Sequence, residues 1–170
     1  MSINILKGVV ILIVTSNIKW KSLLMNTAIP ISVGIISSLI TGNNFDSYSQ
    51  LIQPPLAPPS FIFPIVWSVL YILMGISSYL IVQQTENIRT NKGLIVYAIQ
   101  LALNFFWPVF FFGFKAYLFS FIWLILLIAA IITMTVLFYQ QNKLAAYIQI
   151  PYILWTFFAA YLNLGVYILN

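Results

Sequence analysis

Residues 116–142 read AYLFSFIWLILLIAAIITMTVLFYQQN, a stretch without one charged side chain. A helix needs about 20 mainly apolar residues to cross the hydrocarbon core of a bilayer. The stretch is long enough for one crossing. Its apolar residues are continuous, whereas the strands of a membrane barrel alternate between apolar and polar residues. It therefore predicts a membrane-spanning helix.

Further uncharged stretches occupy 22–45, 47–85, 93–114 and 144–170. The second contains QPPLAPP at 53–59, which cannot be helical throughout because proline lacks the N–H that a helix needs. It divides into a loop and a helix. We expect five spans, with ends good to a few residues, at about 24–41, 62–83, 93–112, 117–139 and 144–168. The predicted fold is an all-α integral membrane protein, a five-transmembrane-helix bundle.

Residues 1–22 precede these spans. Gly8 to Thr15 is apolar but too short to cross a bilayer, and lysines flank it. We expect 1–22 to be an N-terminal extension, interfacial or disordered, and 23–170 to be one membrane domain.

The composition excludes most soluble enzymes. The 170 residues are 62% hydrophobic, 17% aromatic and only 5% charged, whereas soluble domains carry about 25% charged residues. Cysteine and histidine are absent, which removes disulfides, thiol nucleophiles, zinc sites and imidazole bases. Asp46 and Glu86 are the only acids, which argues against a paired-carboxylate site. We expect no metal site and no required cofactor.

The basic residues predict an orientation. The net charge is +5, but the cations lie scattered between apolar stretches, which is typical of membrane topology and not of nucleic-acid binding. With five spans, the N-terminal region and the loops 84–92 and 140–143 lie on one side of the membrane. Six of the seven basic residues are there, namely Lys7, Lys19, Lys21, Arg89, Lys92 and Lys143, and Lys115 lies on the other side. We expect a cytoplasmic N-terminus and an external C-terminus. A C-terminal reporter active only in the cytoplasm would contradict this.

Polar side chains inside the spans should face the bundle interior, because unsatisfied polar groups are costly in hydrocarbon. They recur at helical spacing. The stripes are Pro30, Gly34 and Ser38; Pro64, Trp67, Ser68, Tyr71, Gly75 and Ser78; Tyr97, Gln100, Asn104 and Trp107; and Tyr152, Trp155, Ala159 and Asn163. The fourth span offers only Trp123, Thr133 and Thr135.

Two interpretations of these stripes stay open. One is ordinary helix packing, in which small residues and amides join helices. The other is a mostly apolar pocket with a few polar anchors, suited to a flat hydrophobic ligand. No predicted span contains an acid, a base or histidine, which disfavours proton relays and voltage sensing. Haem ligation by histidine or cysteine is excluded.

The motifs resemble those of the TspO/MBR family, the tryptophan-rich sensory proteins, translocator proteins and peripheral benzodiazepine receptors. QPPLAPP at 53–59 is followed by FPIVWSVLYILMG at 63–75. NFFWP at 104–108, FFG at 111–113, PYILW at 151–155 and the later Ala159, Leu162 and Asn163 resemble its third and fifth helices. The likeness runs from about Pro30 to Asn170, and three motifs in order make it specific.

The resemblance implies a five-helix bundle, usually dimeric, with a pocket beneath the loop that joins the first two helices. Family members bind porphyrins, and some bind cholesterol or synthetic drugs. Some bacterial members promote light-dependent breakdown of protoporphyrin with two tryptophans, which match Trp67 and Trp155. The ligand-binding positions that we expect are Pro54, Pro55, Ala57, Pro58, Pro59, Pro64, Trp67, Tyr71, Asn104, Trp107, Trp155, Ala159, Leu162 and Asn163. The loop prolines would form a stiff lid.

Two positions depart from the family pattern. Many members have a tryptophan and then an acid in the fourth helix, where this chain has Phe119 and Trp123. The cholesterol motif needs a basic residue after a tyrosine, and none follows Tyr167. A sterol function is therefore not expected, and a bacterial cytoplasmic membrane fits better.

The leading hypothesis is a membrane receptor or sensor that binds porphyrins or other flat lipophiles and regulates tetrapyrrole level. The first alternative is a light-dependent porphyrin-degrading catalyst that uses Trp67 and Trp155, so enzymatic activity is left open. A porphyrin or lipophile transporter and a purely structural membrane protein are the others. The expected partners are such a ligand, the lipid bilayer and a second copy of the chain.

Overall fold

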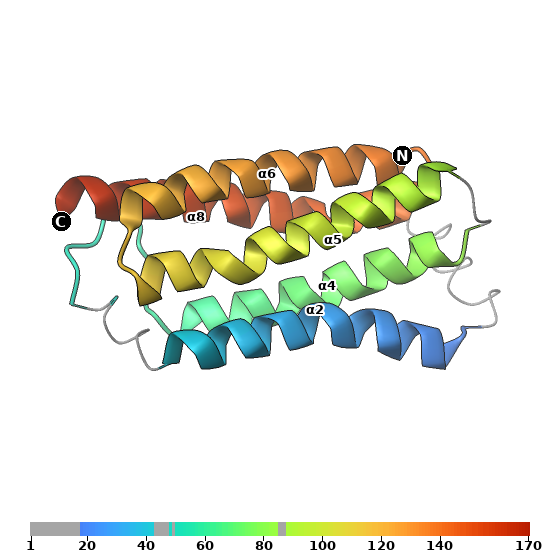
Figure 1. Cartoon of the computed structure of the whole chain (residues 1–170), viewed down its shortest axis with the longest axis horizontal. Coiled ribbons are helices and arrows are strands. Elements are labelled where there is room, and N and C mark those ends of the chain that lie inside the picture. Colours follow the sequence, from blue (N-terminus) through green and yellow to red (C-terminus); the bar gives the residue numbers. More distant parts are fainter. Residues whose placement is uncertain (1–17, 43–47, 49, 85–87) are drawn as a thin grey trace.

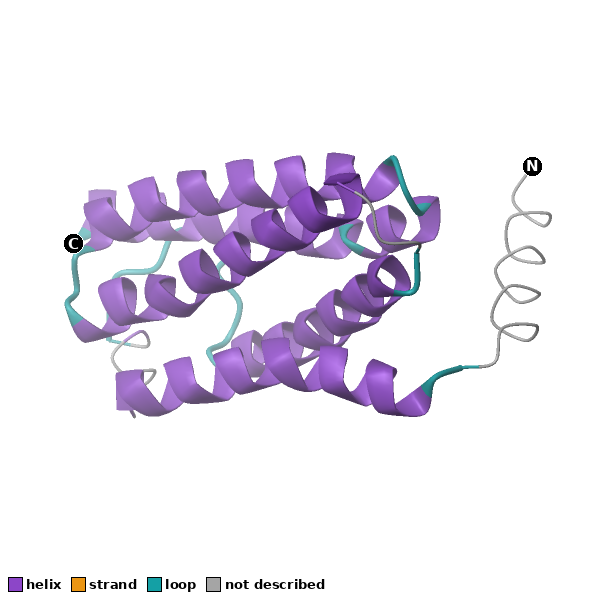
Figure 2. Cartoon of the chain, turned by 45° about the vertical axis from the view of Figure 1, so that its right-hand side comes forward, coloured by secondary structure: helices purple, strands orange, loops and turns teal. Residues whose placement is uncertain are grey.

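The structure is a computed structural model that describes residues 18–42, 48, 50–84 and 88–170, including all of their side chains except those of 88–91. The helices are α2 (Trp20–Thr41), α4 (Ile62–Val82), α5 (Ile88–Pro108), the π-helical turn η2 (Val109–Gly113), α6 (Tyr117–Tyr139), α7 (Lys143–Ile148) and α8 (Ile150–Leu169). Figure 2 shows helices and loops, and no strand, among these residues.

Five described segments are long and apolar enough to cross a membrane: Trp20–Thr41, Ile62–Val82, Lys92–Gly113, Tyr117–Tyr139 and Lys143–Leu169. The prediction of an all-α, five-span membrane bundle is confirmed. In Figure 1, α5 lies between the pair α2–α4 and the pair α6–α8. Helix α2 packs on α4, α5 packs on α6, and α6 packs on α8.

Three helix boundaries differ from the prediction, and one of them is the start of α5, at Ile88 instead of 93. Helix α2 begins at Trp20, inside the predicted extension 1–22 and before the expected start at 24. Charged residues such as Lys21 do not stop a helix at its solvated end. The rest of the predicted extension, 1–17, lies outside the described residues. The last span is interrupted at Gln149 between α7 and α8, because Pro151 cannot donate the next helical hydrogen bond.

The third span ends in a π-helical turn that the sequence did not predict. The Phe114 N–H donates to the Val109 carbonyl five residues earlier, over 2.9 Å. Pro108 precedes this turn and has no N–H, which favours a change of hydrogen-bond pattern there. The wider turn lets the successive side chains of Phe111 and Phe112 both be buried.

The centre of the bundle is an apolar stripe on α6. Leu124, Leu127, Ile131, Met134 and Phe138 are fully buried at helical spacing. The side chain of Thr133, one of the expected inner residues, is instead exposed, and its hydroxyl donates to the Ala129 carbonyl over 2.8 Å. Helix α6 therefore packs by apolar shape, with its lipid-facing hydroxyl satisfied within the helix.

Candidate functional site

A cavity of about 750 Å³ lies between α2, α4, α5 and η2. The predicted ligand positions on its wall are Pro64, Trp67, Tyr71, Asn104 and Trp107. Its wall contains no charged residue. Pockets for small ligands are typically about 300–1,000 Å³, mostly apolar and equipped with a few polar groups. The cavity has that character.

Aromatic rings form one side of the cavity. The ring centroids of Trp67 and Trp107 are 6.2 Å apart, with 33° between the planes. Tyr71 lies beside Trp67, with 5.7 Å between the centroids and 32° between the planes. Three rings from α4 and α5 thus present moderately inclined faces, an arrangement that favours contact with a flat apolar ligand.

A chain of hydrogen bonds joins the cavity wall to the bundle interior. The Tyr71 hydroxyl donates to Asn104 Oδ1 over 2.7 Å, and Asn104 Nδ2 donates to the Tyr152 hydroxyl over 2.9 Å. The Tyr152 hydroxyl in turn donates to Gln100 Oε1 over 2.9 Å. Asn104 therefore connects α4, α5 and α8, and it holds a polar group at the cavity in a fixed orientation.

Asn163 fixes the orientation of the Trp107 ring through a hydrogen bond. The indole Nε1 of Trp107 donates to Asn163 Oδ1 over 3.1 Å, and Ser120 Oγ donates to the same oxygen over 3.0 Å. Asn163 Nδ2 donates to the Tyr117 carbonyl over 2.8 Å. Asn163 is buried and does not line the cavity, so its contact with the site runs through the Trp107 ring.

The other predicted positions of α8 also lie outside this cavity. Trp155 is half-buried, and its ring packs on Phe63, which does line the cavity, with centroids 5.9 Å apart. Its buried indole N–H has no hydrogen-bond partner among the described residues. Ala159 and Leu162 are buried in the core. Trp155 therefore does not line the wall on which Trp67 lies, although it contacts Phe63, which does.

The proline-rich loop is anchored to α8. The Tyr161 hydroxyl donates to the Pro55 carbonyl over 2.8 Å, and Asn170 and Ile52 exchange two hydrogen bonds of 3.0 Å. The ring of Pro54 packs so closely on Gly165 that a Cβ there would lie 2.5 Å from the Pro54 Cβ. These contacts hold the loop across the end of α8.

The loop itself contains a tight turn. The Ala57 N–H donates to the Pro54 carbonyl over 3.2 Å, and Leu56 has a φ of 66°, as the third residue of a type II turn requires. Pro55, Ala57, Pro58 and Pro59 border this turn and do not line the cavity, whereas Ser60 and Phe61 do. The role of these loop residues and of the α8 positions in ligand binding stays a prediction.

Sequence reasoning missed several lining residues. These are Ile31, Ile35, Ser37, Leu39, Ser60, Phe61, Phe63, Ile72, Pro108 and Phe112. The spacing of Gly34 and Ser38 marked the correct face of α2, and Ile31 and Ile35 follow from it by helical periodicity. Nothing in the sequence distinguishes Ile72 or Leu39 from the apolar residues that face lipid.

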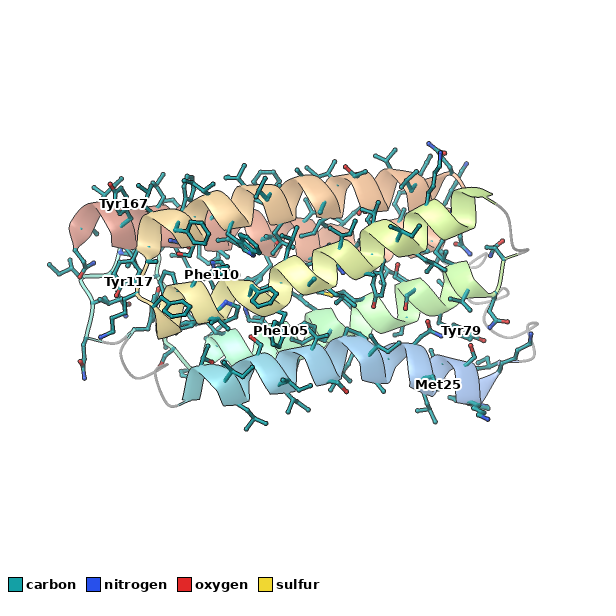
Figure 3. The ribbon with its side chains drawn as sticks, viewed as in Figure 1. Met25, Tyr79, Phe105, Phe110, Tyr117 and Tyr167 are labelled. Carbon is teal, nitrogen blue, oxygen red and sulfur yellow. The ribbon has the colours of Figure 1, made fainter. Side chains whose placement is uncertain are left out.

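A second aromatic cluster lies apart from the cavity, on α5, η2 and α6. Phe110 packs edge-to-face on Phe119 and Trp123, with centroids 4.8 and 4.9 Å away; Figure 3 labels Phe105 and Phe110 along this part of the chain. The Trp123 indole donates to the Leu103 carbonyl over 2.8 Å. Trp123 thus joins α6 to α5 and does not line the cavity.

Tyr48, in the connection between α2 and α4, closes the aromatic core near Phe63, with 5.2 Å between the ring centroids. Burial raises the pKa of the Tyr48 hydroxyl above its ordinary value. The phenol therefore stays neutral at physiological pH, consistent with the uncharged cavity wall nearby.

Residues 26–169 match the model of the TspO/MBR family. The tryptophan-rich protein TspO of Chlorobaculum tepidum is 35% identical over 125 residues, 72% of this chain and 78% of that protein. Protein CrtK of Rhodobacter capsulatus is 36% identical over 124 residues, 72% of this chain and 78% of its own length. The translocator protein of Ovis aries is 34% identical over 147 residues, 85% of this chain and 87% of its own. Together with the five apolar helices, these similarities show that the chain is an integral membrane protein of the TspO/MBR family.

Proposed function

We propose that the protein is a membrane receptor or sensor that binds flat lipophilic ligands, porphyrins foremost, in the cavity between α2, α4 and α5. Family membership supports a receptor-type membrane role. The observation that carries the ligand class is the wall itself, where Trp67, Tyr71 and Trp107 present ring faces. Binding there would regulate the level of the free tetrapyrrole.

The cavity favours a ligand with a large apolar face and few polar groups. Its wall offers no cation to neutralise a carboxylate, so a ligand's acidic groups would remain at the membrane surface. Tyr71 already donates to Asn104 over 2.7 Å, so the second lone pair of Asn104 Oδ1 and the lone pairs of the Tyr71 hydroxyl are the acceptors for a ligand donor. Pyrrole N–H groups are such donors.

Light-dependent porphyrin breakdown is the second candidate, because Trp67 lies on the cavity wall and an indole is an oxidisable electron donor. Trp155 does not line the cavity, and Trp107, 6.2 Å from Trp67, is the second indole on its wall. A catalyst would lose light-dependent bleaching in Trp67→Phe, while a receptor would bind without accelerated bleaching in any variant.

We expect Trp67→Phe to weaken protoporphyrin binding about fivefold, the equivalent of the ~1 kcal/mol that an aromatic contact contributes. Trp155→Phe should leave Kd within about twofold, because its ring does not reach the cavity. The measurement is a titration in the dark, followed by the porphyrin absorbance band so that losing a tryptophan does not alter the readout. Equal effects of the two substitutions would place the ligand outside this cavity.

We also propose that the protein forms a dimer. Of the two pairs of small residues, on α2 and α5, only the pair on α5 supports it. Gly34 faces Tyr71 so closely that a Cβ there would overlap its ring, and Ser38 lines the cavity, so this pair serves the bundle. Ala98 and Ala102 are exposed on α5 and leave space for the close approach of another helix. Crosslinking in native membranes that gave only monomer would count against the dimer.

The described cations also agree with the proposed orientation. Lys19, Lys21, Lys92 and Lys143 lie at the ends of spans that share one side of the bundle, and Lys115 lies in the turn at the other side. The excess of lysine on the first side supports placing it in the cytoplasm.

A further inference from the structure

We propose that the cavity opens sideways into the hydrocarbon core of the bilayer, between α2 and α4, and that the ligand enters through this opening from the membrane. An acyl chain of a phospholipid occupies the opening when no ligand is bound. The route of the ligand rests on the proposed function, whereas the opening and its acyl chain do not.

The exposed part of the cavity wall comes from two helices. On α2, Ile35 and Leu39 are 56% and 75% exposed; Ile72 on α4 is 44% exposed, and Phe61, the residue just before α4, is 62% exposed. The lining residues of α5 and η2, by contrast, are all buried or half-buried. The cavity is therefore closed on the side of α5 and open between α2 and α4.

The opening ends where the two helices touch. Gly34 on α2 lies against the ring of Tyr71 on α4. One to two turns nearer the start of α2, Gly75 of α4 lies against the Thr27 backbone. Beyond Gly34, the α2 residues that face the gap are Ile35, Ser38 and Leu39, and all three line the cavity. The two helices are thus in contact at Gly34 and at Thr27, and the opening lies between Gly34 and the end of α2.

The opening lies at the depth of the acyl chains. Ile72 is at the middle of α4 (Ile62–Val82), about 15 Å along the axis from the first residue of that helix at 1.5 Å per residue. Ile35 lies about 9 Å from the end of α2 (Trp20–Thr41) by the same rise. A gap that reaches the middle of a span faces hydrocarbon for most of its length.

The chemistry of the rim suits hydrocarbon. Ile35, Leu39, Phe61 and Ile72 are apolar, and the exposed Ser68 between them donates its hydroxyl to the Pro64 carbonyl over 2.7 Å. That hydrogen bond leaves the serine with no free donor toward the membrane. An acyl chain can pack against this mainly apolar rim, on which the Ser38 and Ser60 hydroxyls are the remaining polar groups, whereas water there would gain few hydrogen bonds.

The acyl chain can be tested without any porphyrin. The protein is reconstituted in vesicles that contain phosphatidylcholine with a diazirine at the middle of one acyl chain, irradiated, and mapped by mass spectrometry. We expect adducts on the cavity-lining residues Trp67 or Tyr71 as well as on the outer face of α2. In Ile35→Trp, which narrows the opening, the cavity adducts should fall at least fivefold. Adducts confined to outward residues such as Ile36 would overturn the proposal.

The route of entry is tested by kinetics. Protoporphyrin is loaded into donor vesicles and its arrival in proteoliposomes is followed by stopped flow. Ile35→Trp should slow both association and dissociation at least tenfold, because an obstacle in the opening raises the barrier in both directions, whereas a substitution that altered only the cavity would change Kd chiefly through dissociation. Ile36→Trp is the matched control, since Ile36 is 50% exposed on the same helix and does not line the cavity; both rates should stay within twofold.

The outcomes separate the two proposals. If the wild-type protein accepts acyl adducts in the cavity but shows no saturable porphyrin binding, the proposed ligand is overturned and the proposed opening is supported. Saturable binding whose rates are the same in Ile35→Trp and wild type would support the ligand and overturn entry between α2 and α4.

Discussion

Replacing Asn104 with leucine is expected to destabilise the bundle by about 1–3 kcal/mol, although the two side chains have the same branched arrangement of heavy atoms. Asn104 accepts a hydrogen bond from Tyr71 and donates one to Tyr152, so the substitution leaves the Tyr71 hydroxyl without an acceptor. Hydrogen bonds between membrane helices contribute on average about 0.6 kcal/mol and at most about 1.7 kcal/mol, and an unsatisfied buried group adds its own desolvation penalty.

The reason for this loss can be isolated with Tyr71→Phe. If the unpaired Tyr71 hydroxyl causes much of the penalty, Asn104→Leu should cost less in the Tyr71→Phe background than in wild type. Unfolding in mixed micelles, followed by circular dichroism for the four proteins of this cycle, gives the coupling free energy. Effects that add without coupling would show that the 2.7 Å contact contributes nothing to stability.

Thr133→Val is a suitable control for that series. Thr133 is exposed on α6, and its hydroxyl bonds only to the Ala129 carbonyl of its own helix. Its replacement should change stability by less than about 0.5 kcal/mol, as is usual for surface positions.

Thr133 also shows where the sequence misleads. The assumption that polar groups in a span face inward holds for Gln100, Asn104 and Asn163, all of which are buried. It is wrong for Thr133 because a threonine hydroxyl can bond to the carbonyl four residues earlier and then face lipid at little cost. An amide can make the same bond, as Asn26 does to the Ser22 carbonyl over 2.8 Å, but its oxygen and second N–H then still need partners, so amides are the more reliable markers of an inner face.

The number of spans was predictable because length and continuous apolarity decide it locally. The shape of the site was not. The sequence placed Trp67 and Trp155 in one pocket, whereas in the structure Trp67 lines the cavity and Trp155 contacts only its lining residue Phe63. Which of two aromatic residues lines a cavity depends on how helices far apart in sequence cross, and a stripe on one helix carries no information about that crossing.

The crossing of α2 and α4 instead depends on glycines. Gly75 was assigned to an inner stripe by its spacing alone, but its function is specific, because it lets the α2 backbone approach at Thr27. The same crossing places Gly34 against Tyr71, where the opening between the two helices ends. Small residues therefore indicated where two helices meet, although not which two.

Gly75→Ala is consequently expected to have the second large effect, a destabilisation of about 1–3 kcal/mol, which is the usual range for overpacking. Its Cβ would overlap the Thr27 Cα and lie 2.9 Å from the Thr27 Cβ and Oγ1. Helix propensity alone would make this substitution stabilising by roughly 0.5–1 kcal/mol. A measured destabilisation would therefore show that the contact with Thr27 outweighs the gain in helix propensity. Since α2 must move away from α4, we also expect protoporphyrin Kd to rise at least tenfold.

Two other glycines make this prediction specific. A Cβ at Gly113 would have its nearest neighbour 3.9 Å away, at Val109 Cγ1, so Gly113→Ala should leave both stability and Kd close to wild type. Gly34→Ala meets only the side chain of Tyr71, and Tyr71→Ala should partly restore its stability. The corresponding change Thr27→Ala should not rescue Gly75→Ala, because the Thr27 Cα that obstructs the new methyl group belongs to the main chain. Full rescue by Thr27→Ala would mean that side-chain crowding, and not the distance between the two backbones, limits this crossing.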